Sequence, residues 1–181
     1  MDNGASSYRR YLNGEEEAFD EIVEELFEPL VFFIDRYVRD IYAAEDIAID
    51  AFSDLIVHRH RYHFGVSLKT YLFMIGRSRA LNYIKSCARR RELPLEEAAC
   101  LEDRKDMEQR LLLDEQKRAV NAALGELPEA MRLAVHLVYF EALSYEEAAR
   151  VMKKSRKQID NLLYRAKRML RAILEKEVAE L

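Results

Sequence analysis

"SYEEAARVMKKSRKQIDNLLYRAK", residues 144–167, carries the pattern from which the fold of the C-terminal part of the chain is predicted. Ser144 is followed three residues later by Glu147, and Ser155 by Gln158. Each pair can close a capping box, in which two side chains and two backbone N–H groups exchange hydrogen bonds and begin a helix. Two helix starts so close together predict two short helices around a tight turn, the pattern of a helix-turn-helix unit.

The second of these predicted helices has two different faces. Its apolar residues recur at helical spacing and are expected to pack against the domain: Ile159, Leu162, Leu163, Ala166, Leu170 and Ile173. The opposite face carries Arg156, Lys157, Asp160, Asn161, Tyr164, Arg165 and Arg168. A helix with a packed back and a basic, amide-bearing front fits the major groove of DNA. An amphipathic helix with a solvated basic face is the alternative, and the two adjacent capping boxes favour DNA.

The composition favours an all-α protein. The 181 residues are half apolar and include only 5 Gly and 3 Pro, fewer turn-forming residues than hairpins and loops need. Apolar residues recur at helical spacing in residues 15–27, 29–38, 43–58, 68–91 and 107–127. A further helix is predicted to open at Pro128, with Tyr139 in its apolar stripe. We therefore expect two small helical domains, 1–92 and 107–181, joined by a flexible acidic linker, 93–106, with a loop at 58–67.

The charges are strongly segregated along the chain. Residues 1–57 hold 15 acids against 4 bases, whereas residues 58–91 hold 9 bases and no acid. Residues 92–115 hold 9 acids against 3 bases, and residues 116–181 hold 13 bases against 9 acids. Two basic segments that alternate with acidic ones predict that the chain meets polyanions at two places.

Other classes of protein find little support. The longest apolar run, Leu30–Ile34, is too short to cross a bilayer, and no secretory signal is recognised, so a cytoplasmic protein is expected. Cys87 and Cys100 form no disulfide framework. Without a Ser/His/Asp arrangement, a Gly-rich phosphate loop or paired carboxylates, we expect no enzyme and no cofactor.

Two smaller features could carry chemistry of their own. His58, His60 and His63 could form a metal cluster, but their spacing and the arginines between them favour contact with nucleic acid or solvent, so no metal is predicted. Cys87 lies among arginines, which could lower the pKa of its thiol and make it reactive. A packed or surface thiol is the alternative that we favour.

The C-terminal segment "LPEAMRLAVHLVYFEALSYEEAARVMKKSRKQIDNLLYRAKRML", residues 127–170, resembles region 4 of the extracytoplasmic-function (ECF) sigma factors. These belong to the sigma-70 family of bacterial RNA polymerase, and their region 4 reads the -35 promoter element. The resemblance implies that the -35 DNA is contacted by Ser155, Arg156, Lys157, Gln158, Asp160, Asn161, Tyr164 and Arg165.

This segment departs from the family at four positions. The family usually has glycine at Lys153, an apolar residue at Lys154, and a glycine-threonine pair at Lys157 and Gln158. One non-glycine residue at positive φ costs only about 1 kcal/mol, so we expect the fold to tolerate Lys153. The departures at these four positions affect which DNA bases the second helix is expected to prefer.

Two segments of the first predicted domain resemble region 2 of the same family. The first is "AAEDIAIDAFSDLI", residues 43–56, which resembles the acidic segment that docks on the clamp helices of RNA polymerase. The residues that the resemblance assigns to polymerase binding are Glu45, Asp46, Asp50, Phe52 and Leu55. The family usually has glutamine at Ile49 and glutamate at Asp50. A solvated acidic helix face is the alternative.

The second is "FGVSLKTYLFMIGRSRALNYIKSCARRR", residues 64–91, which resembles the part that opens the -10 element. Independently of the resemblance, its aromatic rings and basic side chains suit single-stranded DNA. Stacking of one nucleobase on an aromatic ring contributes about 1 to 3 kcal/mol. The predicted -10 contacts are Phe64, Ser67, Lys69, Tyr71, Arg77, Ser78, Arg79, Asn82, Lys85 and Arg89. The rings on one helix cannot all face DNA, and Phe73 is predicted to be core. The family more often has tryptophan at Tyr71 and asparagine at Ser78.

The resemblance implies an alternative sigma factor with three partners. These are core RNA polymerase, promoter DNA (duplex at -35 and single-stranded at -10), and an anti-sigma factor that clamps the two domains. In the family the linker threads through the RNA exit path of the polymerase. Two other classes stay open from the residues alone: a stand-alone helix-turn-helix regulator with an N-terminal sensor or dimerisation domain, and a protein whose helices only dock partners.

Overall fold

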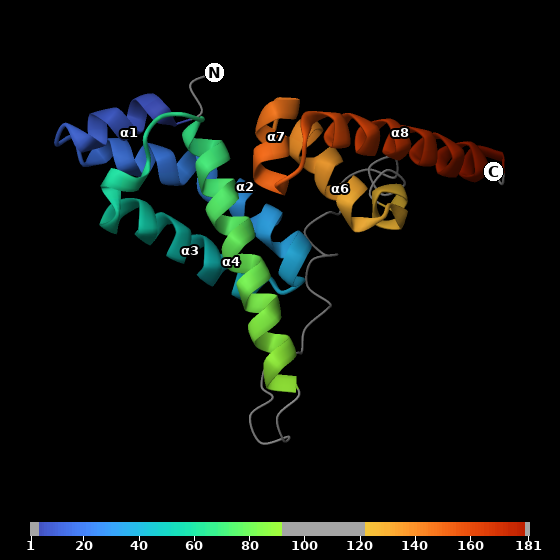
Figure 1. Ribbon diagram of the computed structural model, residues 1–181, viewed down its shortest axis with the longest axis horizontal. Coiled ribbons are helices and arrows are strands. Elements are labelled where there is room, and N and C mark those ends of the chain that lie inside the picture. The colour runs from blue at the N-terminus through green and yellow to red at the C-terminus, as the bar shows by residue number, and fades with distance from the viewer. Residues whose placement is uncertain (1–3, 92–121, 180–181) are drawn as a thin grey trace. The chain divides into compact units, whose positions relative to one another are not determined.

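The computed structural model describes residues 4–91 and 122–179 (Figure 1). Throughout these residues the ordered elements are helices, which confirms the predicted all-α class. The chain divides into two compact units, Met1–Arg104 and Lys105–Leu181. The predicted linker 93–106, and the part of the predicted helix 107–127 before residue 122, lie outside the described residues. Of the helices described, none is long and apolar enough to cross a membrane.

The first unit is built around one long central helix. Its elements are α1 (Ala5–Leu12), α2 (Glu17–Val38), α3 (Ile41–Val57), the 3-10 turn η1 (Arg59–Arg61) and α4 (Leu68–Arg91). Helix α2 packs against α1, α3 and α4, and α3 also packs against α4. Phe73 of α4 is fully buried and stacks on Phe33 of α2 with ring centroids 4.8 Å apart, so the prediction that Phe73 is core is confirmed.

The two helices predicted before and after Pro29 are one helix in the structure. Helix α2 continues from Glu17 to Val38 with Pro29 inside it. A proline within a helix removes one hydrogen bond and costs about 3 kcal/mol. The apolar positions stay in phase across it, however, and Leu26, Leu30 and Ile34 are all buried. Because each such side chain contributes about 1.5 to 3 kcal/mol on burial, packing outweighs the local cost.

Helix α1 was not predicted, although it belongs to the core of the first unit. Tyr8 is fully buried and its hydroxyl donates to the carbonyl oxygen of Leu55 at 2.9 Å. The helix follows Gly4, which has φ +82, and a Cβ at Gly4 would lie 3.1 Å from the side chain of Leu68. The buried tyrosines Tyr8 and Tyr11, three residues apart, are the signal that could have revealed this short helix.

Close approach between helices also explains one glycine inside α4. A Cβ at Gly76 would lie 2.9 Å from Cδ1 of Leu30 and 3.1 Å from Cδ1 of Ile34. Both neighbours are fully buried core residues of α2. The lack of a side chain at Gly76 therefore lets α4 pack closely on α2.

The described part of the second unit consists of a helical segment at 122–126, then α6 (Glu129–Val135), η3 (His136–Phe140), α7 (Tyr145–Met152) and α8 (Arg156–Ala179). Helix α8 packs on both α6 and α7. The core between them includes Met131, Ala134, Leu137, Leu143, Ala148, Val151, Ile159, Leu163 and Ala166.

The helix predicted from Pro128 changes its winding at His136. Element η3 is a single π turn, in which the N–H of Glu141 donates to the carbonyl oxygen of His136 at 3.0 Å. The wider turn rotates the following side chains. Tyr139, predicted to be part of the apolar stripe, is 50% exposed instead. Beneath it His136 Nε2 lies 3.1 Å from Glu141 Oε1, and both residues are buried.

Candidate nucleic-acid interface

Both predicted capping boxes of the helix-turn-helix are present. The N–H of Ser144 donates to Glu147 Oε2 at 2.9 Å, and the N–H of Glu147 donates to Ser144 Oγ at 3.2 Å. The N–H of Ser155 donates to Gln158 Oε1 at 2.8 Å, and the N–H of Gln158 donates to Ser155 Oγ at 3.2 Å. These bonds satisfy backbone donors that have no partner within the helix. The starts of α7 and α8 are therefore set by local sequence.

The turn between α7 and α8 depends on one left-handed residue. Lys153 has φ 53 and ψ 47, and its N–H donates to Arg150 O at 3.2 Å. The N–H of Lys154 donates to Ala149 O at 2.9 Å. This is the Schellman arrangement that usually ends on glycine. The turn therefore forms with lysine where the resembling family has glycine.

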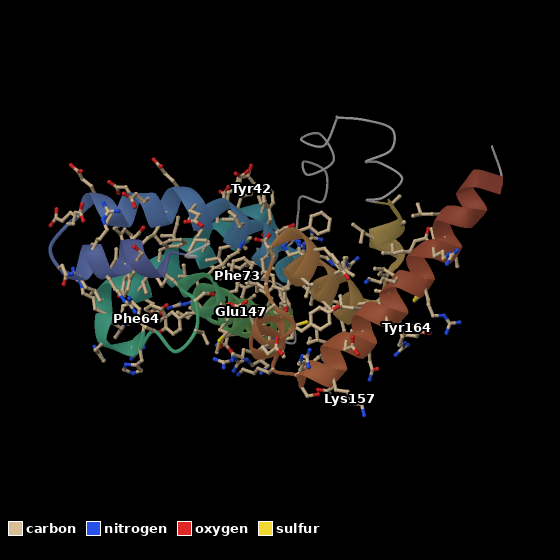
Figure 2. All side chains as sticks on the ribbon, turned by 90° about the horizontal axis from the view of Figure 1, so that it is seen from above. Tyr42, Phe64, Phe73, Glu147, Lys157 and Tyr164 are labelled. Carbon is tan, nitrogen blue, oxygen red and sulfur yellow. The ribbon has the colours of Figure 1, made fainter. Side chains whose placement is uncertain are left out.

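The predicted faces of α8 agree with the structure. Ile159, Leu163 and Ala166 are buried, and Leu162, Leu170 and Ile173 are half-buried. The whole predicted front is exposed: Arg156, Lys157, Asp160, Asn161, Tyr164, Arg165 and Arg168. Figure 2 shows Lys157 and Tyr164 on the side of α8 that faces away from α6 and α7. Ser155 and Gln158 are exposed too, but the capping box already uses their polar atoms.

The charges near the start of α8 include an acidic residue from α7. Arg156 Nε lies 2.7 Å from Glu146 Oε1, and both side chains are mostly exposed. An exposed pair of this kind contributes little to stability, so Arg156 can exchange Glu146 for a phosphate. A shallow hollow of about 420 Å³ lies beside the pair and is lined by Tyr145, Arg156, Lys157 and Asp160. Partial burial, followed by the neighbouring Tyr139, raises the pKa of Tyr145.

Helix α3 exposes an acidic face that also carries large apolar side chains. Asp46 and Asp50 are exposed and Glu45 is half-buried. Tyr42 is 67% exposed and Ile49 is 53% exposed, and both share the helix face of Asp46 by their spacing. Neither residue was among those predicted to bind polymerase, and Ile49 was noted only as the position where the family usually has glutamine.

Two residues assigned to the polymerase-binding face are core instead, and that prediction was wrong. Phe52 is 5% exposed, and its ring packs against Phe27 with centroids 5.8 Å apart. Leu55 is 1% exposed, and its carbonyl accepts the hydroxyl of Tyr8. At 3.6 residues per turn these two positions fall on the side of α3 opposite Asp46, where α2 packs. They position the helix but are not available to a partner.

The loop before α4 is held by a cluster of aromatic rings. Tyr62 is buried, its hydroxyl donates to Val66 O at 2.7 Å, and its ring lies 4.7 Å from that of Phe64 and 5.1 Å from that of Tyr71. Phe64 and Tyr71, predicted separately as stacking residues, are thus joined through Tyr62. Burial raises the pKa of Tyr71, and burial also raises the pKa of the neighbouring Tyr8 to about 12.

The exposed polar residues of α4 share one face with Tyr71. Ser78, Asn82, Lys85 and Arg89 follow Tyr71 at spacings of seven, four, three and four residues, and all four are exposed. Lys69 and Arg77 are half-buried beside them, with Lys69 Nζ 5.7 Å from the Phe73 ring centre. Ser67 Oγ accepts the N–H of Thr70 at 3.2 Å. The hydroxyl of Ser67 therefore acts as the cap of α4, a role that the sequence prediction of a DNA contact missed.

Arg79, predicted as a DNA contact, points toward α3 in the structure. Its Nη1 lies 3.1 Å from Asp50 Oδ2, and its Nη2 pairs with Asp54. The hydrogen bond from Arg79 lowers the pKa of Asp54. His58 Nδ1 lies 3.4 Å from the other oxygen of Asp54. Arg79 thus links α3 and α4 because it projects from the side of α4 that packs on α3.

His58 and His60 lie near each other, and His58 also lies near an acid. His58 lies against Asp54, and its ring centre is 6.3 Å from that of His60. Within the described residues no group of three or more His, Cys, Asp or Glu side chains is placed to hold a metal ion.

Comparison with known families matches both units. The family model for "Sigma-70 region 2" matches residues 22–91, and that for "Sigma-70, region 4" matches residues 117–170. The RNA polymerase sigma-H factor of Pseudomonas aeruginosa is 28% identical over 175 residues, which cover 92% of this chain and 91% of that protein. The ECF RNA polymerase sigma factor SigM of Bacillus subtilis is 24% identical over 162 residues, which cover 88% and 96%.

Solved structures share the fold. The sigma factor RpoE of Bartonella quintana, in complex with the anti-sigma factor NepR, has a TM-score of 0.63 and 22% identity over 87% of this chain and 96% of that one. CnrH, in complex with the cytosolic domain of CnrY, has a TM-score of 0.62 and 21% identity over 96% of both chains. With region 2 and region 4 both matched in order and relatives aligned over nearly its whole length, the chain belongs to the sigma-70 family and is an ECF-type alternative sigma factor that directs RNA polymerase to promoters.

Proposed function

We propose that three exposed faces divide the work of promoter recognition. The acidic face of α3 binds core polymerase, the face of α4 that continues from Tyr71 holds the unpaired -10 strand, and the front of α8 reads the -35 duplex. The observation that carries this division is the change in charge between exposed faces: acids on α3, and bases with amides on α4 and α8. Chemistry stays with the polymerase, so this chain needs no catalytic group, cofactor or metal and works in the cytoplasm beside it.

The polymerase-binding face is proposed to consist of Glu45, Asp46, Asp50, Tyr42 and Ile49. Exposed large apolar residues beside carboxylates suit a protein partner. A protein interface can bury the apolar side chains while basic residues of the partner pair with the carboxylates. Asp46 takes the central place, since Asp50 also pairs with Arg79.

The -10 face is proposed to combine one stacking region with a row of polar contacts. Phe64 and Tyr71 supply rings, and stacking of one base contributes about 1 to 3 kcal/mol. Ser78 and Asn82 offer hydrogen bonds to a base edge, which a flipped base requires. The basic side chains proposed to contact phosphates are Lys69, Arg77, Lys85 and Arg89.

The -35 face is proposed to be the front of α8, with Arg156, Lys157, Asp160, Asn161, Tyr164 and Arg165 toward the groove. Asn161 can pair with adenine and Asp160 can accept from a cytosine amine. Ser155 and Gln158 keep the helix start in place through their capping box.

The decisive experiment is run-off transcription with core polymerase, with and without the full chain, on genomic fragments. A sigma factor yields transcripts from discrete start sites only when it is present. A stand-alone regulator would instead bind duplex DNA tightly without polymerase and leave a symmetric footprint. Absence of new start sites, with active core polymerase and folded protein, would contradict the proposal.

The boundaries and a further partner belong to the same proposal. We place region 2 in residues 1–92, the linker in 93–106 and region 4 in 107–181.

An anti-sigma factor is proposed because the structure of RpoE was solved with an anti-sigma factor and that of CnrH with the cytosolic domain of a partner. Proteins that copurify with the chain from uninduced cells would be purified and added to the run-off assay. Inhibition of transcription by one of them would support this partner, and none inhibiting would count against it.

A further inference from the structure

Helix α1 lies before the residues matched by the region 2 family model, yet it packs on the loop that leads to the proposed -10 face. The Tyr8 ring lies 5.5 Å from that of Tyr62 and 6.2 Å from that of Phe64. Arg59 of η1 reaches back to α1, with Nη2 donating to the Tyr11 hydroxyl at 2.7 Å. The loop between α3 and α4 is therefore shaped by α1 as well as by its own residues.

Phe64 occupies an unusual backbone conformation in that loop. Its φ is 56, in the left-handed region that non-glycine residues rarely adopt. Such a conformation persists where surrounding contacts hold it, and it is concentrated at functional sites. Here those contacts are the rings of Tyr8 and Tyr62 and the side chain of Arg9.

Arg9 is the exposed member of this group. Its guanidinium carbon lies 4.7 Å from the centre of the Phe64 ring. Within residues 4–91 and 122–179, no carboxylate pairs with Arg9. The next residue, Arg10, is fully engaged by contrast: it lies 2.7 Å from Glu15 and 2.9 Å from Glu21, and hydrogen bonds to these two carboxylates raise its pKa.

We propose that Arg9 is an additional contact for the unpaired -10 strand, so that α1 is part of the DNA-binding surface. The inference rests on the proposed -10 face. Phe64 holds the guanidinium plane, and the N–H edge then donates to a phosphate of the strand beside the base that the loop binds. A planar guanidinium on a ring keeps its donors available and orients them, which suits phosphate recognition. Residues 58–69, which include this loop, contain no Asp or Glu.

The test uses the full chain with core polymerase and a forked promoter DNA whose non-template -10 strand is single-stranded. Arg9→Ala is expected to weaken binding about two- to fivefold, as for the loss of one exposed ion pair with a phosphate. The slope of log affinity against log salt should shrink by about 0.7, as for one phosphate contact on a single strand. Arg9→Lys keeps the charge and should keep the slope while binding more weakly, because lysine does not hold a plane on the ring.

Arg10→Ala is the matched control, since it removes the same charge from the same helix but not from the Phe64 ring. It should leave both affinity and slope unchanged. A duplex that ends before the -10 element should bind all variants equally, and an equal loss on both DNAs for Arg9→Ala would overturn the inference. Thermal unfolding of each variant, followed by circular dichroism, verifies that the fold is retained, and Arg9→Lys carries the test if Arg9→Ala does not fold.

Failure of this inference differs from failure of the proposed function. If Tyr71→Ala and Asn82→Ala weaken binding to the forked DNA while Arg9→Ala does not, the -10 face stands and α1 has no part in it. If none of the three changes matters, the proposed -10 face is wrong and the Arg9 contact falls with it.

Discussion

At the scale of single residues, the turn of the helix-turn-helix shows how a fold accepts an unfavourable residue. Lys153 adopts φ 53 so that two N–H groups can reach the last carbonyls of α7. Left-handed backbone costs a side-chain-bearing residue about 1 kcal/mol. The capping boxes on either side, closed by Glu147 and Gln158, hold both helix ends in the required geometry. The capping interactions on either side therefore hold the turn in place, although Lys153 is unfavourable there.

Replacing Lys153 with glycine should stabilise the second unit by up to about 1 kcal/mol, because glycine adopts the left-handed region without strain. Calorimetric unfolding of the full chain would show a higher midpoint for the transition of that unit. Lys154→Gly is the control: Lys154 is not among the residues with positive φ, so glycine there gains nothing. A lower midpoint for Lys153→Gly would show that the strain is absent.

At the scale of elements, α3 and α4 are linked by charge as well as by packing. Arg79 of α4 pairs with Asp50 and Asp54 of α3, and His58 lies against Asp54. This cluster connects the helix that we propose for polymerase binding with the one proposed for the -10 strand. Reversal of Asp50 would place a base against Arg79 and disturb the fold, so Asp46 is the residue with which to test docking.

Arg79→Ala should destabilise the first unit by about 1 kcal/mol at pH 7, as expected for a half-buried ion pair. Arg79 lowers the folded pKa of Asp54, so the stabilisation is present above the ordinary carboxyl value of 3.8 and is lost as the pH falls through the lower folded value. Urea unfolding followed by circular dichroism should therefore show the variant and wild type converging below about pH 4. Arg77→Ala, on the same helix, should show no such convergence; an equal pH dependence in both variants would argue against the pair.

At the scale of the whole molecule, α3 in the first unit and α8 in the second expose faces of opposite charge. The exposed face of α3 carries Asp46 with Tyr42 and Ile49, whereas the front of α8 carries Arg156, Lys157 and Arg165. The attraction of basic side chains to phosphate depends on the salt concentration. Contacts of apolar side chains with a protein partner depend on it far less. Binding to polymerase and binding to the -35 element should accordingly respond differently to ionic strength.

Asp46→Arg should strongly reduce copurification of the chain with core polymerase while leaving its circular dichroism unchanged. The physical reason is that a base replaces an exposed carboxylate at the centre of the proposed docking face. Glu24→Arg on α2 makes the same change of charge at an exposed position away from α3 and should copurify normally. Equal recovery of polymerase with both variants would remove the docking proposal.

Replacing Arg156 and Lys157 with alanine should weaken use of the -35 element in transcription by the holoenzyme. For every phosphate of the duplex that is no longer neutralised, the salt slope of promoter binding should fall by about 0.9. Arg171→Ala, farther along α8, serves as the control for loss of charge on the same helix. Unchanged promoter strength and slope in the double variant would place the recognition surface elsewhere.

Features that depend on near neighbours along the chain were predictable from the residues alone. The capping boxes at Ser144 and Ser155 each need two residues three apart, and both form as predicted. The buried and exposed faces of α8 likewise follow from helical spacing. The proposed -10 face was predictable for the same reason. Its residues on α4 share one side because a single helix carries them at helical spacing: Tyr71, Ser78, Asn82, Lys85 and Arg89. Such features need only local geometry, which a short window of residues contains.

The partner that each side chain meets across the fold depends on how the helices pack together. Phe52 and Leu55 are core because α2 and Tyr8 pack against them, and Arg79 pairs with α3 because two carboxylates lie opposite it. Helix α1 reaches the loop of Phe64 from far along the chain. Packing and ion pairing act between surfaces brought together by the whole fold, so no local pattern encodes them. For this reason the two faces of α8 were predictable, and the partners that side chains such as Arg79 meet on other helices were not.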